Sequence, residues 1–300
     1  MKKKTYLFAL MAMALTLGSC SDNENGIGGE TSKYITVSTS IGNMTRVATD
    51  ANGGQTFEEG DEISVYAWTG DATIAPDASE RVVNNAINKL TNGSWVSTPQ
   101  MLWKNNRDKH YFIGVYPISA ISDLTAGEYT FDVNKQTESD LLVAVNPDGL
   151  SYSADAQQTV PLTFTHVMAK LAVKLTYKNQ WGGIPTVEKV VVGNAAKEAT
   201  INYLTKVVTP STTAKEDFSL PEITENTKYV SVIIPQEDVK QLTIVIGGKN
   251  FVYDNGTPFK LESGKITTVN LEVGRDEIKL GDVKITDWEN GSTFSGEALN

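Results

Sequence analysis

The side chains that could do covalent or acid–base chemistry are few and scattered along these 300 residues. The chain has two histidines and one cysteine. His110 and His166 stand in different halves, which is not the spacing of a zinc site. We expect His110 on the surface of an edge strand and His166 as a hydrogen-bonded core residue. With no nucleophile elbow, phosphate loop or dinucleotide fingerprint, the sequence favours a non-enzymatic protein without a cofactor.

Acidic and aromatic stretches offer two further chemistries. The acids of residues 58–62 lie in a turn between expected strands, where solvated carboxylates are common, and do not indicate a glycosidase pair. The loop of residues 50–61 has oxygen ligands but not the order of a calcium loop, so calcium binding stays open. Trp95, Trp103 and Trp181 could form a sugar platform, although such residues more often fill a sandwich core.

The single cysteine closes an export signal. Three lysines at positions 2–4 precede an apolar run of residues 6–17 that is too short to span a bilayer, which is typical of a secretory leader. Its end, Leu17-Gly18-Ser19-Cys20, resembles the lipobox of bacterial lipoproteins, in which the leader is cut before a cysteine that carries acyl chains. The alternative is an ordinary signal peptide with a free thiol. Lipidation of Cys20 predicts a protein held at the outer membrane by lipid and without disulfides.

The charge excludes several partners. The formal net charge is −10, and loss of the three leader lysines makes it −13 (−10 − 3). Nucleic acid needs a basic footprint, and anionic lipid surfaces would repel such a chain. The sequence therefore predicts no nucleic-acid partner and a membrane attachment that depends on the acyl chains.

Short alternating segments predict an all-β protein. Residues 34–41 alternate apolar and polar side chains, whereas residues 63–68 place Ile63, Val65 and Ala67 on one face and aromatic residues on the other. Strands are also expected at 109–116 and 265–273, and turn signals separate many such runs. The apolar parity changes at Met168-Ala169, which predicts a bulge or a break between two strands. We expect a signal peptide at 1–19, a lipidated flexible tether at 20–33, and antiparallel β-sandwich domains at 34–155 and 156–300. We also predict a turn at 146–149 and, from a weak signal, a single helix at 118–124.

Several motifs in a fixed order resemble the fimbrillin (Mfa-like, type V pilin) family of Bacteroidetes. They follow the lipobox along the chain: Thr45-Arg46; Phe57-x-x-Gly60-Asp61-x-Ile63; Tyr111-Phe112-x-Gly114-x-Tyr116-Pro117; Gln136-x-x-Ser139-Asp140-Leu141; Leu162-x-Phe164-x-His166-x-Met168; Gly264-Lys265; and Ile285-x-x-Trp288-x-x-Gly291. The acidic residues Asp22 and Glu24 after Cys20 also resemble a surface-export signal of Bacteroidetes lipoproteins.

The resemblance implies a fold and a mechanism. The fold is two transthyretin-like antiparallel β-sandwich domains in tandem, in a structural or adhesive subunit of a surface fimbria. The mechanism is delivery as a lipoprotein, cleavage by a trypsin-like protease after a basic residue, and loss of the first strand. A strand of another fimbrial subunit then fills the groove that is left.

The residues of this chain fit such a mechanism. Arg46 is the only basic residue between Lys33 and Arg81 and sits in a turn-rich connection, so cleavage would leave Val47 as the mature N-terminus. Removing strand 34–41 would bare backbone groups that a donated strand could pair.

Two questions stay open at this stage. The donor anchors that we expect are Val283, Ile285 and Trp288, with Phe294 and Leu299 beyond them; equally, residues 282–288 could be the last strand of their own sandwich. The alternative function is a permanently anchored surface lipoprotein, as a fimbrial anchor or tip or as a binder of glycan or host ligand.

Overall fold

A computed structural model describes residues 33–42, 56–153, 159–254 and 256–288. The fold is all-β, as predicted, and the only helical segment within these ranges is a 3-10 turn, η1 (Asn179–Trp181). The strands are β1 (Thr36–Ile41), β2 (Glu62–Thr69), β3 (Val83–Thr91), β4 (Ser94–Thr98), β5 (His110–Tyr116), β6 (Gly127–Thr130), β7 (Leu142–Leu150), β8 (Thr159–His166), β9 (Ala169–Tyr177), β10 (Val187–Ala196), β11 (Glu198–Asn202), β12 (Val207–Pro210), β13 (Lys215–Ser219), β14 (Glu222–Thr224), β15 (Lys228–Ile233), β16 (Gln241–Ile246), β17 (Lys249–Asp254), β18 (Lys265–Val273) and β19 (Ile278–Asp287).

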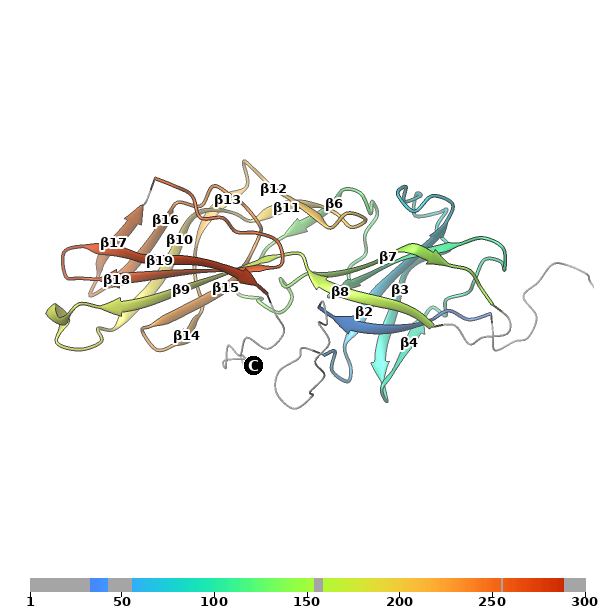
Figure 1. Ribbon diagram of the computed structural model, residues 1–300, viewed down its shortest axis with the longest axis horizontal. Coiled ribbons are helices and arrows are strands. Elements are labelled where there is room, and N and C mark those ends of the chain that lie inside the picture. The colour runs from blue at the N-terminus through green and yellow to red at the C-terminus, as the bar shows by residue number, and fades with distance from the viewer. Residues whose placement is uncertain (1–32, 43–55, 154–158, 255, 289–300) are drawn as a thin grey trace, which may run out of the picture.

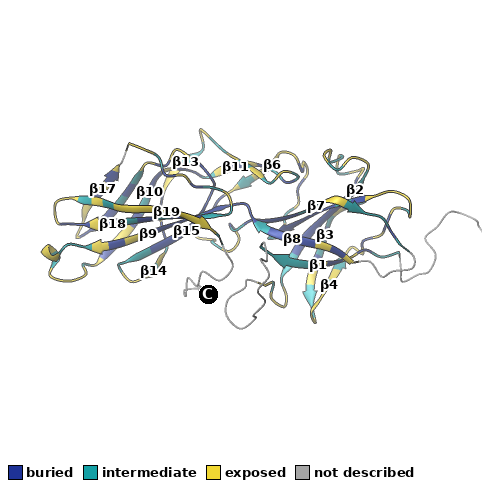
Figure 2. Cartoon of the chain, in the orientation of Figure 1, coloured by how far each residue is buried: buried dark blue, intermediate teal, exposed yellow. Residues whose placement is uncertain are grey.

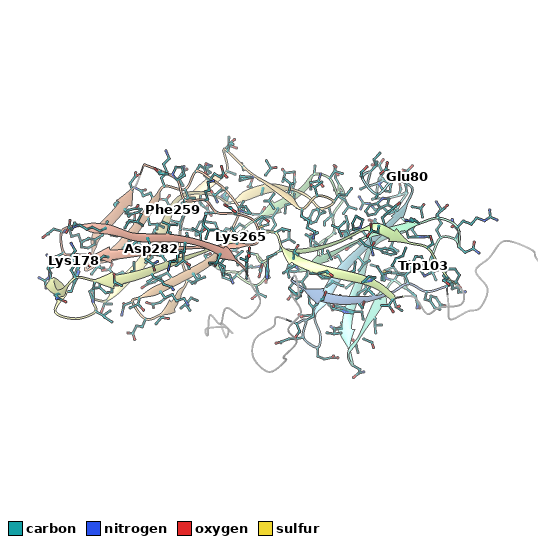
Figure 3. All side chains as sticks on the ribbon, in the orientation of Figure 1. Glu80, Trp103, Lys178, Phe259, Lys265 and Asp282 are labelled. Carbon is teal, nitrogen blue, oxygen red and sulfur yellow. The ribbon has the colours of Figure 1, made fainter. Side chains whose placement is uncertain are left out.

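The strands form four sheets in an elongated molecule (Figure 1). A seven-stranded sheet, here the N-terminal sheet, has the order β1-β8-β7-β5-β2-β3-β4. A five-stranded sheet (β14-β15-β9-β18-β19) and a four-stranded sheet (β13-β10-β16-β17) make up most of the other end. A three-stranded sheet (β12-β11-β6) joins a strand of the first half to two strands of the second. Trp103 lies at one end of the molecule and Lys178 at the other (Figure 3).

The N-terminal sheet curls until its two edge strands meet. Trp95 Nε1 on β4 donates a hydrogen bond to Thr39 Oγ1 on β1 over 3.0 Å, and Ile35 N donates to Met101 O over 3.0 Å. The curled sheet encloses one hydrophobic cluster, to which β2 contributes Ile63 and Val65. The alternate residues of β2, the aromatics among them, face a second and larger cluster. The predicted division of β2 into two apolar faces is confirmed.

One chain path connects the two ends. β8 runs in the N-terminal sheet and β9 in the five-stranded sheet, with only Val167 and Met168 between them. Both residues are buried, so this connection belongs to the larger core cluster. The parity change predicted at Met168-Ala169 is therefore a break between two strands, because each strand turns its apolar face towards the core of a different sheet.

Two ladders correct the expectation of purely antiparallel pairing. β1 pairs with β8 in parallel, and β18 pairs with β9 in parallel. Neither pair is connected by a hairpin, since long stretches of chain separate the partners, so turn geometry does not force an antiparallel arrangement.

Two local predictions need correction. No helix forms at 118–124, because its backbone groups bond to β2 instead of to each other: Ser119 N donates to Ser64 Oγ, and Ile121 N donates to Tyr66 Oη. The turn predicted at 146–149 does not end β7, which runs through it, but the signal does mark a bulge. Gly149 N donates to Asn146 Oδ1 over 3.0 Å, Gly149 has a φ of 63°, and the ladder with β5 shifts register between Asn146 and Leu150.

Candidate assembly interface

β1 is the strand that closes the N-terminal sheet. Among the described residues its one strand partner is β8, with Thr36 opposite Thr159 and Ile41 opposite Phe164. The chain next to β1 also bonds to the segment after β4, since Trp103 N donates to Lys33 O over 3.1 Å. This strand thus bridges the gap between the two edges of the curled sheet.

β1 and the residue before it place apolar side chains in the enclosed core. Ile35 and Val37 are 2% and 6% exposed, and both belong to the cluster inside the N-terminal sheet. Full burial of such a side chain stabilises by roughly 1.5–3 kcal/mol. The other residues of β1 are half-buried or exposed, so the strand meets the core with one face only.

An aromatic cluster lines the core beside β1. The ring of Phe57 contacts those of Trp95, Tyr116 and Phe164 edge to face, with centroids 5.3, 5.3 and 5.1 Å apart. Burial, with the negative charge of Asp61 added, raises the pKa of Tyr116 to about 12. The Phe57 ring therefore packs where strands from both edges of the sheet converge.

Close packing of β8 beside this aromatic cluster depends on Gly114 of β5. A Cβ at Gly114 on β5 would lie 2.6 Å from Cζ of Phe164 and 3.1 Å from Cδ1 of Leu162, both on β8. Only a residue without a side chain lets the β8 rings and methyl groups approach β5 so closely. Gly114 thereby fixes the position of the strand on which β1 rests.

The C-terminal strand β19 is an edge strand of the five-stranded sheet. It pairs with β18 along its length, Lys265 opposite Asp287 and Val273 opposite Ile278. Val283 and Ile285 lie on the core side of this ladder, opposite Val269 and Thr267, yet remain 39% and 40% exposed. Figure 2 shows β19 mostly in the colour of exposed residues. Two of the predicted donor anchors are thus only partly covered in this arrangement.

The third predicted anchor, Trp288, directly follows β19 and lies at the junction of the two sheets. Its indole stacks on the imidazole of His166, the last residue of β8, with centroids 3.9 Å apart and an interplanar angle of 8°. The amine of Lys170 lies 4.2 Å from the indole centroid, and Trp288 N donates to Gly264 O over 2.9 Å. His166 Nδ1 lies 2.8 Å from Asp140 Oδ1. His166 is the hydrogen-bonded core histidine that the sequence predicts.

His110 is not the surface residue that the sequence predicts. It is fully buried, because β5 lies in the middle of the N-terminal sheet and not at its edge. Its Nε2 accepts a hydrogen bond from Lys104 N over 3.0 Å, and its Nδ1 donates to Asp108 O over 3.1 Å. Burial lowers the pKa of His110, which matches a neutral ring that donates from one nitrogen and accepts at the other.

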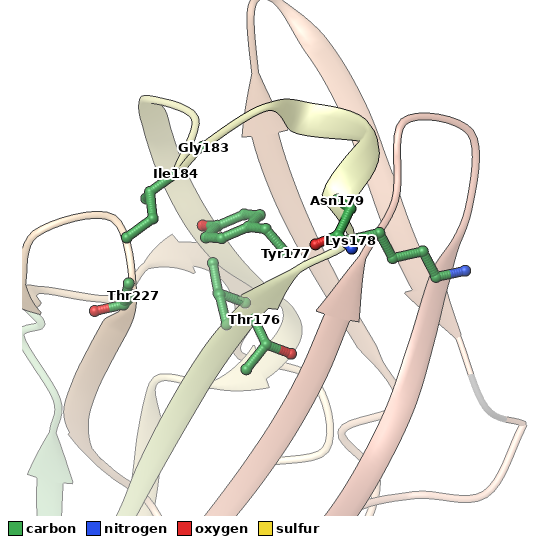
Figure 4. Close-up of a pocket in the computed structure, with 8 residues that line it drawn as sticks. Thr176, Tyr177, Lys178, Asn179, Gly183, Ile184 and Thr227 are labelled. Carbon is green, nitrogen blue, oxygen red and sulfur yellow. The ribbon is translucent and has the colours of Figure 1, made fainter.

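A shallow pocket of about 370 Å³ lies at the far end of the five-stranded sheet (Figure 4). Its wall includes Tyr177, Ile184 and Thr227, and the Lys178 side chain points away from it. The ring of Tyr177 is held in place because its hydroxyl donates to Asn226 O. None of the residues that the sequence analysis selected lines this pocket. No cluster of three metal-binding side chains occurs in the part of the chain that the structure describes.

The processing residues cannot be placed. Cys20, Arg46 and Val47 lie outside the described residues, as do residues 50–55, the first half of the loop of residues 50–61. Among residues 33–42, 56–153, 159–254 and 256–288, no helix is long and apolar enough to cross a bilayer.

Sequence reasoning missed the contacts that hold the two critical strands. It did not predict that Phe57 packs on Phe164, that Trp95 bonds to β1, or that Trp288 stacks on His166. Each contact joins residues far apart in the chain, so no local period reports it. The one sequence feature that pointed to these contacts was the recurrence of isolated aromatic residues beside turn signals.

The fold and the sequence match known proteins. A family model described as fimbrillin-like matches residues 45–288. A Bacteroides uniformis protein named as fimbrium subunit Fim1C is 24% identical over 323 residues, covering 99% of this chain and 100% of that protein.

Two crystal structures described as cell adhesion proteins share the fold. The one from B. uniformis has a TM-score of 0.63 at 20% identity, covering 85% of this chain and 99% of that one. The one from B. ovatus has a TM-score of 0.62 at 19% identity, covering 85% and 98%. With the family model covering most of its length, this chain belongs to the fimbrillin-like family.

Proposed function

We propose that this chain is a subunit of a cell-surface fimbria that assembles by strand exchange. A protease removes β1 together with its lipid anchor, and a strand from another subunit takes its place. The observation that carries the proposal is the position of β1, an edge strand on β8 that closes a curled sheet and fills its core with Ile35 and Val37. Family membership supports the fimbrial role and favours a structural protein over an enzyme.

Loss of β1 would create a specific acceptor. The backbone groups of β8 that face β1 would lose their partners, and apolar side chains such as Leu162 and Phe164 would meet water. Both changes are costly, and a new strand with apolar residues at alternate positions reverses them. The free energy of this exchange can drive assembly without a nucleotide.

Cleavage at Arg46 is supported by the other arginines of the chain, which are held in place. The guanidinium of Arg81 is buried and donates to Ile121 O over 2.9 Å. The amides of Arg107 and Asp108 both donate to the Asn105 side chain. Arg275 lies over the ring of Trp181 at 5.6 Å and donates its amide to Gln180. A protease needs a backbone that can extend in its active site, and these three sites resist that change.

The C-terminal segment is our proposed donor. Val283 and Ile285 are spaced like Ile35 and Val37, and their exposure in β19 means that they lose little when they leave it. They would gain cover in the groove that β1 vacates. One observation favours the alternative function: β19 already forms a full ladder with β18. In that alternative the chain is a permanently anchored surface lipoprotein that does not polymerise. It would serve as a fimbrial anchor or tip, or bind a host or glycan ligand.

We also propose two transthyretin-like sandwich domains. The pairing of β8 with β1 and β7 supports a boundary at Val167-Met168, in place of the expected division between residues 155 and 156. The expected leader at 1–19 and tether at 20–33 stay proposals, as does lipid attachment at Cys20.

Cysteine pairs test the exchange. Thr159→Cys on β8 and Lys284→Cys on β19, placed in one chain with Cys20→Ser, should form disulfide-linked ladders between subunits after cleavage at Arg46, and none before. The control pairs Thr159→Cys with Lys189→Cys on the four-stranded sheet. Ladders in the control, or ladders in an Arg46→Ala background, would rule out strand exchange. Polymer formation by Arg46→Ala would likewise show that cleavage is not required.

A further inference from the structure

The shallow pocket at the far end of the five-stranded sheet takes no part in the proposed assembly. It lies between the end of β9, the loop that leads to β10 and the turn between β14 and β15. Its volume is about 370 Å³, within the range of small-ligand sites. Neither β1 nor β19 contributes a residue to its lining, so strand exchange leaves its walls unchanged.

Asn226, in the turn between β14 and β15, holds the walls of the pocket together. Its carbonyl accepts a hydrogen bond from the hydroxyl of Tyr177, and its Oδ1 accepts one from Val187 N over 2.7 Å. Its own amide donates to Glu222 Oε1 over 2.6 Å. The end of β9, the start of β10 and the turn are thus fixed without a ligand. A preformed site of this kind spares a ligand the cost of ordering it.

Apolar surface in the pocket is open to solvent. Ile184 is 64% exposed, although its side chain is aliphatic. The ring of Tyr177 lies between Ile184 and Asn179, and the side chain of Ile184 is on the same side as Thr227 (Figure 4). Buried Leu175 also lines the pocket. One aromatic ring and two aliphatic side chains therefore offer apolar contact to a ligand.

The polar groups of the pocket are uncharged and have hydrogen-bonding capacity left. Within the described part of the chain, the side-chain amide of Asn179 forms no hydrogen bond. The hydroxyl of Thr227 lies 3.5 Å from Thr224 O, which is long for a hydrogen bond. Lys178 is the one charged residue of the lining, but its side chain points away and pairs with Glu277. The pocket thus presents an amide and a hydroxyl but no charge.

We propose that this pocket binds an uncharged sugar residue of a glycan. A sugar ring has a face of C–H groups that packs on an aromatic ring, and hydroxyl groups around its edge. Tyr177 and Ile184 suit the first, and Asn179 and Thr227 suit the second. An apolar peptide side chain fits less well, because it would cover the amide of Asn179 without giving it a partner. An acidic sugar would find no cation to pair with.

This inference deepens the proposed surface role by naming a ligand class and its site. It rests on that role only because a glycan must lie within reach of the protein. Binding uses neither β1 nor the anchors of β19. Failure of sugar binding therefore leaves the proposed strand exchange untouched, and failure of the cysteine-pair test leaves the sugar site untouched.

An NMR titration of the purified full chain tests the proposal, with lactose, N,N′-diacetylchitobiose and mannobiose as neutral probes. At least one probe should bind with a Kd on the order of 1 mM, as expected for one or two sugar rings on a shallow site. The amide signals that shift should be those of residues 176–184 and of Thr227.

A pair of double variants localises the binding. Asn179→Ala/Ile184→Ser removes the free amide and the aliphatic contact, and should weaken binding of that probe roughly tenfold. The control Asn250→Ala/Val252→Ser makes the same kind of change at exposed positions of β17 outside the pocket, and should bind like the parent chain. Unchanged amide signals elsewhere in each variant show that the fold is retained.

Three results would overturn the proposal. The first is that none of the three probes shifts the pocket signals, and the second is an equal loss of binding in both double variants. The third is tighter binding of a different class of ligand at the same residues. N-acetylleucinamide would indicate an apolar peptide, and a sialylated form of lactose that binds more tightly than lactose would indicate an acidic sugar.

Discussion

The indole of Trp288 lies flat against the imidazole of His166, so the end of the last described strand touches the end of the strand that carries β1. His166 also forms a hydrogen bond with Asp140, which lies two residues before β7. A pair of stacked rings therefore connects the end of the C-terminal strand to the N-terminal sheet. The C-terminal segment of the unassembled subunit is held at this point.

Replacing Trp288 should loosen β19 at that end. Trp288→Ala removes the stack on His166 and the contact with Lys170, which together contribute about 1–2 kcal/mol. We expect faster amide hydrogen exchange in residues 282–287. The control is Trp181→Ala, which removes a hydrogen bond to Val273 O at the opposite end of the ladder and should accelerate exchange near Ile278 instead. If each variant accelerates exchange equally at both ends of the β18–β19 ladder, Trp288 does not hold β19 locally.

The hydrogen bond between Trp95 and Thr39 should retain β1. Thr39→Val keeps the shape but leaves the indole N–H of Trp95 without its acceptor, a cost of about 1 kcal/mol. Amide exchange of residues 37–41 should rise about fivefold. Thr36→Val, which disturbs only an exposed contact with Thr159, is the matched control and should change exchange much less.

An added methyl group at Gly114 should destabilise the N-terminal sheet. In Gly114→Ala the Cβ would meet the Phe164 ring, which is itself fixed by Phe57, so the free energy of unfolding should fall by about 1–3 kcal/mol. In Gly193→Ala on β10 the nearest atom is the flexible end of Gln241, and the loss should be smaller. Urea unfolding compares the two. A Gly114→Ala chain as stable as the parent would show that β8 can move away from β5.

His110 should make stability depend on pH. Burial lowers its pKa below the ordinary value of 6.5, so below that pH the unfolded chain binds a proton that the folded chain does not. The stabilisation is present above pH 6.5 and is lost as the pH falls towards the lowered pKa of the folded state.

The variant His110→Gln keeps a donor and an acceptor without titrating. Its free energy of unfolding should vary less than that of the parent chain between about pH 7 and pH 5. Denaturant titrations across this range provide the test. If the free energy of unfolding changes with pH by the same amount in both proteins, His110 is not the cause of the pH dependence.

The sequence predicts the regular strands well and their partners poorly. β18 has the predicted bounds, because alternation over nine residues is a strong local signal. β13 was missed, since the exposed edge sequence of residues 215–219 is charged and has only Phe218 buried. The buried state of His110 was also unpredictable, because it follows from the place of β5 within the sheet and not from its neighbours in the chain.

The same limit applies to the candidate interface. Alternation identified β1 as a half-buried strand, and family motifs suggested that it is replaceable. No sequence signal could report that β1 bridges the two edges of one sheet, because that depends on Trp95 and Met101 reaching it from a segment about 60 residues away. Pairing between distant segments is decided by the whole core.

The near-continuous path of β8 and β9 has a mechanical consequence. Nineteen residues, 159–177, run in one direction with only two buried residues between the strands. At about 3.3 Å per residue this path extends about 60 Å. Bending the molecule at Val167-Met168 would pull apolar side chains out of a close-packed core, so a subunit resists flexing there. Filaments built from such units would behave as stiff rods whose compliance lies at the joints between subunits.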